Sequence, residues 1–143
     1  MFRKILLPID GSEHSKRAVD AAISICKGKN QCRITLLTIQ HSLPLWIGEM
    51  AFAYAEVETK LEKECNDMLS PFKERIQAEG VVCQSLVIKS SSPAYEIYSI
   101  AKDHNFDLIV MGSRGLGKVS ELWLGSVSHT VVQQAPCPVL VVK

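Results

Sequence analysis

One short segment of the chain reads Asp107-Leu108-Ile109-Val110-Met111-Gly112-Ser113-Arg114-Gly115, an apolar run that passes directly into a glycine-containing turn. A short apolar run closed by turn residues is typical of a strand that is covered on both faces of a sheet. The glycines stand where this strand would end. We therefore expect a buried strand over 107–111 whose carboxyl end carries an unusual turn.

Similar apolar segments predict further strands over 5–9, 33–39, 81–88 and 138–142. Helical periodicity lies between them, over 13–28, 53–79, 93–104 and 126–135. Strands that alternate with helices indicate an α/β fold, an open parallel sheet with helices on both faces. In such sheets ligands bind at the carboxyl ends of the strands. No linker, repeat or low-complexity tract divides the sequence, so we expect a single domain over 1–143.

Polar and glycine residues mark the expected helix ends. Ser12 or Asp10 is expected to accept the free amides of the first helix, and Gly28 to end it. Ser92 is expected to cap the third helix, with Pro93 in its first position. These signals place the helix starts close to the strand ends.

The second predicted helix has one apolar face, with steps of three or four residues between Val57, Leu61, Cys65, Met68, Phe72 and Ile76. Pro71 lies inside this pattern, and proline removes a backbone donor and clashes with the preceding turn. We therefore expect a kink or a break near Ser70. Gly80 is expected to end the segment.

The composition excludes several classes of protein. The chain has 143 residues, 47% of them hydrophobic and 22% charged, which is ordinary for a folded domain. Its 16 Lys and Arg against 15 Asp and Glu give a net charge of +1, which argues against a nucleic-acid partner. No apolar run is long enough for a signal peptide or a membrane span, so we expect no membrane partner and a cytoplasmic location. The five cysteines form no Cys-x-x-Cys pair, and we expect them to be buried thiols in a reducing compartment.

The glycine segment has the features of a phosphate site. Four glycines, Gly112, Gly115, Gly117 and Gly125, fall within fourteen residues. Glycine permits positive φ and lets a ligand approach the backbone, and successive free amides attract an anion. Ser126 begins the helix that follows, whose N-terminus adds partial positive charge, and Arg114 and Lys118 add two cations. The alternative is that these glycines only form a tight turn.

Two common nucleotide motifs almost match this segment. A P-loop needs Ser or Thr after the Gly-Lys pair, but Val119 follows Lys118. A dinucleotide fingerprint starting at Gly115 would need a third glycine where Ser120 stands. Neither motif therefore describes the site.

A third pattern fits completely: Gly112-x-x-Gly115, nine residues, then Gly125-Ser126. The chain also begins with Ile5-Leu6-Leu7-Pro8-Ile9-Asp10-Gly11-Ser12 and ends with Ala135-Pro136-Cys137-Pro138-Val139-Leu140-Val141-Val142. On these residues the chain resembles the universal stress protein family, in its nucleotide-binding branch. The resemblance spans nearly the whole chain and is weakest over 41–60.

The resemblance implies a Rossmann-like sheet of five parallel strands, bound ATP (or AMP or ADP) with Mg or Mn, and a homodimer through the final strand, Val139 to Val142. It places Asp10 at the ribose, Pro8 and Ile9 beside the adenosine, and the backbone of Ile39 at the adenine. Met111 and Gly112 would line the nucleoside. The phosphates would be surrounded by Gly115, Gly125, Ser126, Val127 and Ser128, to which the loop cation Arg114 is added. The resemblance does not specify which residues hold the metal.

The sequence shows no catalytic constellation, and we predict no catalytic residue. None of the histidines, His14, His41, His104 and His129, forms a recognisable motif with Ser or Asp. Cys137 lies between two prolines and has no neighbouring base. The leading hypothesis is therefore a nucleotide-binding regulatory protein of the stress response. The alternatives are a nucleotide-free interaction module of the same fold and a slow ATPase.

Overall fold

The computed structural model describes residues 1–43, 50–116 and 124–143. Strands and helices alternate along the chain: β1 (Lys4–Pro8), α1 (Glu13–Cys26), β2 (Arg33–Gln40), α2 (Ala51–Ala78), β3 (Val82–Lys89), α3 (Pro93–Asp103), β4 (Leu108–Gly112), α4 (Ser126–Gln134) and β5 (Val139–Val142). These bounds agree with the predicted segments to within about two residues. The expected α/β fold is confirmed.

The strands form one parallel sheet in the order β3-β2-β1-β4-β5. The chain first builds outward from β1 to β3, then returns to the other side of β1 for β4 and β5. The direction therefore reverses between β1 and β4, and ligands of open α/β sheets bind at such a switch point. The carboxyl ends of β1 and β4 carry the two turns that the sequence singles out.

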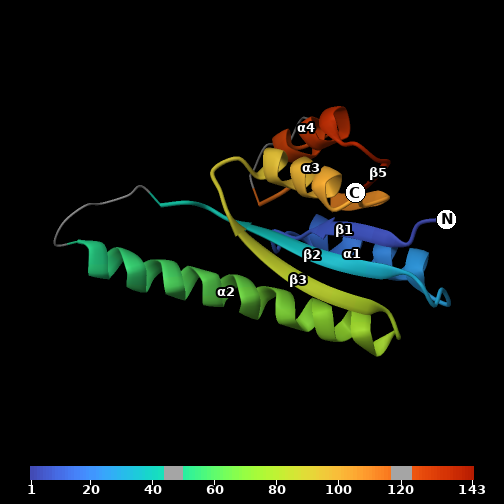
Figure 1. The fold of residues 1–143 in the computed structure, drawn as a ribbon, viewed down its shortest axis with the longest axis horizontal. Helices are drawn as coiled ribbons and strands as arrows, with labels where there is room; N and C mark the ends of the chain where they lie inside the picture. The colour runs from blue at the N-terminus through green and yellow to red at the C-terminus, as the bar shows by residue number, and fades with distance from the viewer. Residues whose placement is uncertain (44–49, 117–123) are drawn as a thin grey trace.

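Two layers of helices cover the sheet (Figure 1). On one face α1 and α2 pack against side chains such as Leu7, Leu36 and Val110. On the other face α3 and α4 pack against their neighbours in sequence, such as Leu37 and Ile109. Because successive side chains of a strand point to opposite faces, a strand buried on both faces is apolar throughout.

The strand β2 continues beyond its neighbour β1. Pairing between β1 and β2 ends at Pro8 and Leu37, whereas pairing between β2 and β3 continues to Gln40 and Lys89. Among the described strands, the last residues of β2 therefore have a neighbour on the β3 side only. At the switch point, the backbone groups of β2 that face the β1 side therefore have no neighbouring strand among the described strands.

The helix ends follow most of the sequence signals. Ser12 is the N-cap of α1, and its Oγ accepts the Ser15 N–H at 3.1 Å. Gly28 and Gly80 follow α1 and α2 with φ of +75°, a conformation that suits glycine. Ser92 does stand at the N-cap of α3, but its side chain makes no cap hydrogen bond. The expected cap at Ser92 is therefore absent.

Pro71 does not break the second helix. The helix α2 continues through it from Ala51 to Ala78. Pro71 lies on the exposed side of α2, whereas Leu69 and Ile76 are buried against the sheet. Packing of the buried face therefore keeps the helix whole. Among the described helices, none is both long and apolar enough to cross a membrane.

The expectation that all five cysteines are free is wrong. Cys26, the last residue of α1, forms a disulfide with Cys32, which directly precedes β2. The turn between them brings their Cα atoms to 5.3 Å, within the range that a disulfide spans. Both residues are buried. Cys65, Cys83 and Cys137 are free thiols, but only Cys83 is buried as expected, and Cys65 and Cys137 are half-buried.

Candidate functional site

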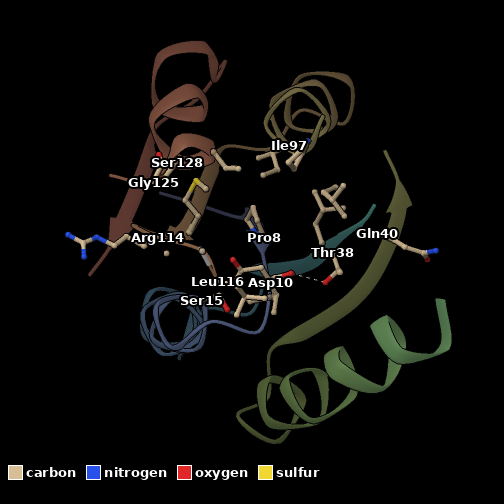
Figure 2. Close-up of a pocket in the computed structure, with 18 of the residues that line it drawn as sticks. Pro8, Asp10, Ser15, Thr38, Gln40, Ile97, Arg114, Leu116, Gly125 and Ser128 are labelled. Atoms are coloured by element: carbon tan, nitrogen blue, oxygen red, sulfur yellow. Dashed lines mark hydrogen bonds between the residues drawn. The ribbon is translucent and has the colours of Figure 1, made fainter. Parts of the chain in front are cut away.

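A cavity of about 730 Å³ opens at the carboxyl ends of β1, β2 and β4 (Figure 2). Twelve of the residues that the sequence assigned to the site line this cavity: Pro8, Ile9, Asp10, Ile39, Met111, Gly112, Arg114, Gly115, Gly125, Ser126, Val127 and Ser128. The structure thus brings together residues from four separate parts of the chain. The volume is in the range of small-molecule sites.

Asp10 stands in the turn between β1 and α1. Its Oδ1 accepts the Ser12 N–H at 2.9 Å, which holds the turn, while Ser12 rather than Asp10 caps the helix. Its Oδ2 lies beside the backbone of Gly115, where an added Cβ would come within 2.7 Å of this oxygen. The Asp10 carboxylate therefore lies between the turn that follows β1 and the glycine segment that follows β4.

The glycines of the site are needed for space rather than for backbone conformation. None of Gly112, Gly115 and Gly125 has a positive φ, contrary to the expected use of conformational freedom. A Cβ on Gly112 would come within 2.8 Å of the His14 backbone, so this glycine lets α1 pack against β4. At Gly125 a Cβ would be 3.4 Å from its nearest neighbour. An alanine side chain at Gly125 would therefore fit, in van der Waals contact with Arg114, Ser113 and Ser128.

Ser113 connects the parts of the site. Its carbonyl accepts the Gly125 N–H and the Ser128 Oγ–H, both at 2.7 Å. Its N–H donates to the carbonyl of Val142 at 2.7 Å, and its Oγ is 3.1 Å from His14 Nδ1. The end of β4 is thereby fixed to α1, to the start of α4 and to β5. The sequence alone predicted no role for Ser113.

The N-terminus of α4 faces the cavity through Ser126, Val127 and Ser128. Its N-cap is Gly125, and no described side chain makes a cap hydrogen bond to it. The Ser128 hydroxyl donates to carbonyls and so does not fill the place of a cap. The first amides of a helix carry partial positive charge and bind anions. This end of the cavity is therefore suited to a phosphate.

Arg114 is the one predicted loop cation that falls within the described residues. Arg114 lines the cavity, but Figure 2 shows its side chain leading away from the central group around Pro8 and Asp10. Its carbonyl lies 3.4 Å from the Ser12 Oγ, so the residue helps to hold the loop. Gly117 and Lys118, the other predicted members of this loop, lie outside the described residues.

One wall of the cavity was not predicted. It comes from α2, which contributes Leu61, Glu64, Cys65 and Met68, and from the end of β2, which contributes Thr38, Gln40 and His41. Of the periodic apolar stripe on α2, Leu61, Cys65 and Met68 line the cavity and Ile76 is buried, whereas Val57 is 46% exposed. However, the spacing alone does not tell which strand end the stripe meets.

Burial raises the pKa of the Cys65 thiol, and the nearby Glu64 and Glu62 raise it further. A thiol with a raised pKa stays protonated at neutral pH and is a poor nucleophile. Among the described residues, no group of three or more His, Cys, Asp or Glu side chains is arranged to hold a metal ion. The geometry is that of a binding cavity with a place suited to an anion at the N-terminus of α4.

The whole chain, residues 1–143, matches the model of the universal stress protein family. The chain belongs to this family. The universal stress protein YxiE of Bacillus subtilis is 35% identical over the full length of both chains. A universal stress protein of Thermus aquaticus is 38% identical, also over the full length of both.

Solved universal stress protein structures have the same fold. The structure of hypothetical protein MJ0577 superimposes with a TM-score of 0.89 at 30% identity and covers all of this chain and 96% of its own. A family member solved in complex with cAMP has a TM-score of 0.75 at 24% identity, covering 99% and 97%. One from Arabidopsis thaliana, solved with AMP bound, has a TM-score of 0.70 at 23% identity, covering 98% and 90%. The last two identities are low enough that they support the fold alone.

Proposed function

We propose that this universal stress protein binds an adenine nucleotide, ATP or its shorter relatives, in the cavity at the switch point. The phosphates lie against Gly115, Gly125 and the first turn of α4. The ribose lies at Asp10, and the base lies at the end of β2. That two structural neighbours were solved with AMP and with cAMP agrees with this class of ligand.

The N-terminus of α4 is the observation that carries the proposal. Helix amides usually have side-chain or backbone partners, yet here no described side chain caps them. The N-cap is Gly125, so a phosphate oxygen that approaches these amides meets no N-cap side chain. The geometry therefore leaves a place for an anion that the fold does not fill.

The overhang of β2 supports the position of the base. The carbonyl of Leu37 accepts the Ile9 N–H, so backbone groups of this parity point toward β1. Ile39 has the same parity but lies beyond the last pair between β1 and β2. Its backbone edge is thus directed at the cavity, where a base can take the place of a neighbouring strand.

The proposal includes a divalent ion, Mg or Mn, bound chiefly through the phosphates. Mg²⁺ in nucleotide sites is typically held by substrate phosphates, water and one or two carboxylates. Asp10 is a carboxylate that lines the cavity, and the described residues offer no separate cage. The ion would neutralise phosphate charge that this end of the cavity meets mainly with backbone amides.

We further propose a regulatory homodimer in the cytoplasm. The sheet ends in β5, whose one side has no strand neighbour among the described strands and whose Leu140 is 39% exposed. An apolar edge strand presents unpaired backbone groups that favour pairing with another strand. A second copy of β5 satisfies this edge, and occupancy of the nucleotide site then has a partner surface to influence.

Replacing Gly125 with alanine tests the phosphate site. The variant should fold, because the added Cβ meets nothing closer than 3.4 Å. It should bind ATP with Mg²⁺ about 30-fold more weakly, or about 2 kcal/mol, by calorimetric titration, because the Cβ occupies the phosphate approach. Gly80→Ala is the matched control. Its positive φ costs about 1 kcal/mol of stability, but it lies far from the cavity and should leave ATP affinity unchanged.

Unchanged ATP affinity in Gly125→Ala would refute the phosphate assignment. If the unmodified protein shows no thermal stabilisation by ATP with Mg²⁺, the nucleotide-free interaction module replaces the proposal. A ligand at 100 times its Kd should add about 2.7 kcal/mol, which such a measurement detects. Mass spectrometry of the nucleotide released from the denatured purified protein identifies the resident ligand.

A further inference from the structure

Met68 connects the α2 wall of the cavity to the turn that carries Asp10. The residue is half-buried, and its side chain lines the cavity. Gly11, which follows Asp10, has a φ of +84°, and a Cβ added to it would come within 3.1 Å of the Met68 Sδ. The sulfur therefore lies against the backbone of the turn that positions Asp10.

The other three methionines of the chain lack one of these two properties. Met1 and Met50 are 91% and 60% exposed, and neither is among the described residues that line the cavity. Met111 lines the cavity but is only 5% exposed. Met68 is thus the methionine that combines access from the cavity with contact to a turn of the site.

We propose that Met68 is an oxidation site through which a peroxide controls nucleotide binding. This inference rests on the proposed function and adds a means of regulating the same site. One oxygen atom passes from hydrogen peroxide to the Sδ: a sulfur–oxygen bond forms, the oxygen–oxygen bond breaks, and water leaves with both protons. The sulfur is oxidised, the peroxide is reduced, and the product is methionine sulfoxide.

A sulfoxide does not suit the place that the thioether occupies. Oxidation converts an apolar side chain into a polar one, and a buried polar oxygen is costly without a hydrogen-bond donor. The neighbours of Met68 along the α2 wall, Leu61 and Cys65, are apolar or weakly polar. On the other side, the backbone of Gly11 leaves little space for an added atom. The oxidised side chain should therefore displace the turn or swing into the cavity, and both movements oppose nucleotide binding.

A bound nucleotide should in turn protect Met68. Small-molecule cavities cover most of the surface of their ligand, so a nucleotide in this cavity covers the wall that peroxide has to reach. Saturating ATP with Mg²⁺ should slow sulfoxide formation at Met68 about tenfold. Met50, outside the cavity, should oxidise at the same rate with and without ATP. Peptide mass spectrometry after timed exposure to peroxide measures both rates in one sample.

The affinity test compares each protein before and after peroxide. In the unmodified protein, ATP affinity by calorimetric titration should fall about tenfold once Met68 is oxidised, and methionine sulfoxide reductase should restore it. Met68→Leu is similar in volume and has no sulfur, so peroxide should leave its own ATP affinity unchanged. Met50→Leu is the matched control, and it should lose affinity on oxidation as the unmodified protein does.

The reductase also separates Met68 from Cys65 on the same wall, because it does not act on oxidised cysteine. The inference is overturned if protein with Met68 oxidised binds ATP as tightly as before, or if Met68→Leu loses as much affinity as the unmodified protein. Equal oxidation of Met68 with and without ATP overturns it as well. Met68→Ile provides the same comparison if the leucine variant does not fold. Failure of the untreated protein to bind any adenine nucleotide would instead refute the proposed function.

Discussion

Asp10 uses its two carboxylate oxygens differently. Oδ1 holds the turn through the Ser12 N–H, and Oδ2 lies against Gly115 at the cavity. The sequence permitted both a capping role and a ribose contact for this residue. In the structure the first belongs mainly to Ser12, and the second oxygen remains directed at the site.

An amide in place of the carboxylate should separate these roles. In Asp10→Asn the Oδ1 can still accept the Ser12 N–H, so stability should stay within about 0.5 kcal/mol of the unmodified protein. ATP should bind about fivefold more weakly, because a ribose hydroxyl bonds more strongly to a charged acceptor. Asp10→Ala should lose both the hydrogen bond from the Ser12 N–H and the contact with the ribose. Its free energy of unfolding should fall by about 1 kcal/mol. Equal ATP affinity in all three proteins, by titration calorimetry, would remove Asp10 from the site.

Individual residues also differ in how well the sequence predicts them. The spacing of Gly112, Gly115 and Gly125 led to the cavity that these glycines line, because glycines at the carboxyl end of a parallel strand commonly make room for a ligand. Their mechanism was inferred less well: none uses positive φ, and Gly112 serves the packing of α1. The contact of Met68 with Gly11 was not predicted, because a contact between a helix and a distant turn is visible only once the fold is built.

At the scale of the helices and strands, the exposed half of α2 is attached to β3 by charged side chains, in addition to the buried half that packs on the sheet. Lys89, the last residue of β3, lies 3.0 Å from the Glu58 carboxylate and 3.7 Å from that of Glu62. Tyr54 donates to Glu58 at 2.9 Å. The hydrogen bonds from Lys89 and then Tyr54 lower the pKa of Glu58, and the bond to Glu58 raises the pKa of Lys89. This group fixes the exposed half of α2.

Stability should therefore depend on pH through Glu58. A carboxyl whose pKa is lower in the folded state stabilises the fold above its unfolded pKa, and this contribution is lost as pH falls through the folded pKa. Lys89→Met should thus unfold at lower urea concentration than the unmodified protein at pH 7, and at the same concentration near pH 3. Lys63→Met, a matched change on the exposed side of α2, should show no such difference. A difference for Lys89→Met that persists at low pH would mean that it arises from packing.

Element bounds were predicted well because their signals are local. Glycine after a helix, proline at its start and an apolar run in a strand each act within a few residues. Pro71 is the exception: its local signal favours a break, but packing of the flanking Leu69 and Ile76 against the sheet prevails. The facing of α2 onto the cavity could not be predicted, because it depends on how the whole helix lies across the sheet.

At the scale of the whole molecule, the sheet of the described strands has two open edges, β3 and β5. If β5 forms the dimer, Leu140→Lys should shift the protein to monomer in sedimentation experiments, since a lysine at an edge opposes strand pairing. Val82→Lys is the matched change on β3, where Val82 is 66% exposed, and it should leave the dimer intact. Loss of the dimer in Val82→Lys alone would assign the interface to the other edge.

The disulfide between Cys26 and Cys32 joins α1 to β2 at the opposite end of the strands from the cavity. Replacing both cysteines by serine should lower the free energy of unfolding by about 2 kcal/mol, as expected for a short closed loop. Cells quenched with acid and alkylated should yield this pair unmodified if it is oxidised in vivo. If both residues are alkylated, they are thiols in the cell, as is usual for a protein in the cytoplasm.

The bond between Ser113 and Val142 has a practical consequence for these experiments. The carbonyl of Val142 accepts the Ser113 N–H. The Ser113 carbonyl in turn accepts the Gly125 N–H and the Ser128 hydroxyl. A purification tag appended after Lys143 would therefore lie close to the residues to which we assign the phosphates. Met1 is 91% exposed and precedes the first strand. For binding studies, tags and immobilisation sites are better placed before Met1, where they should not alter the measured nucleotide affinity.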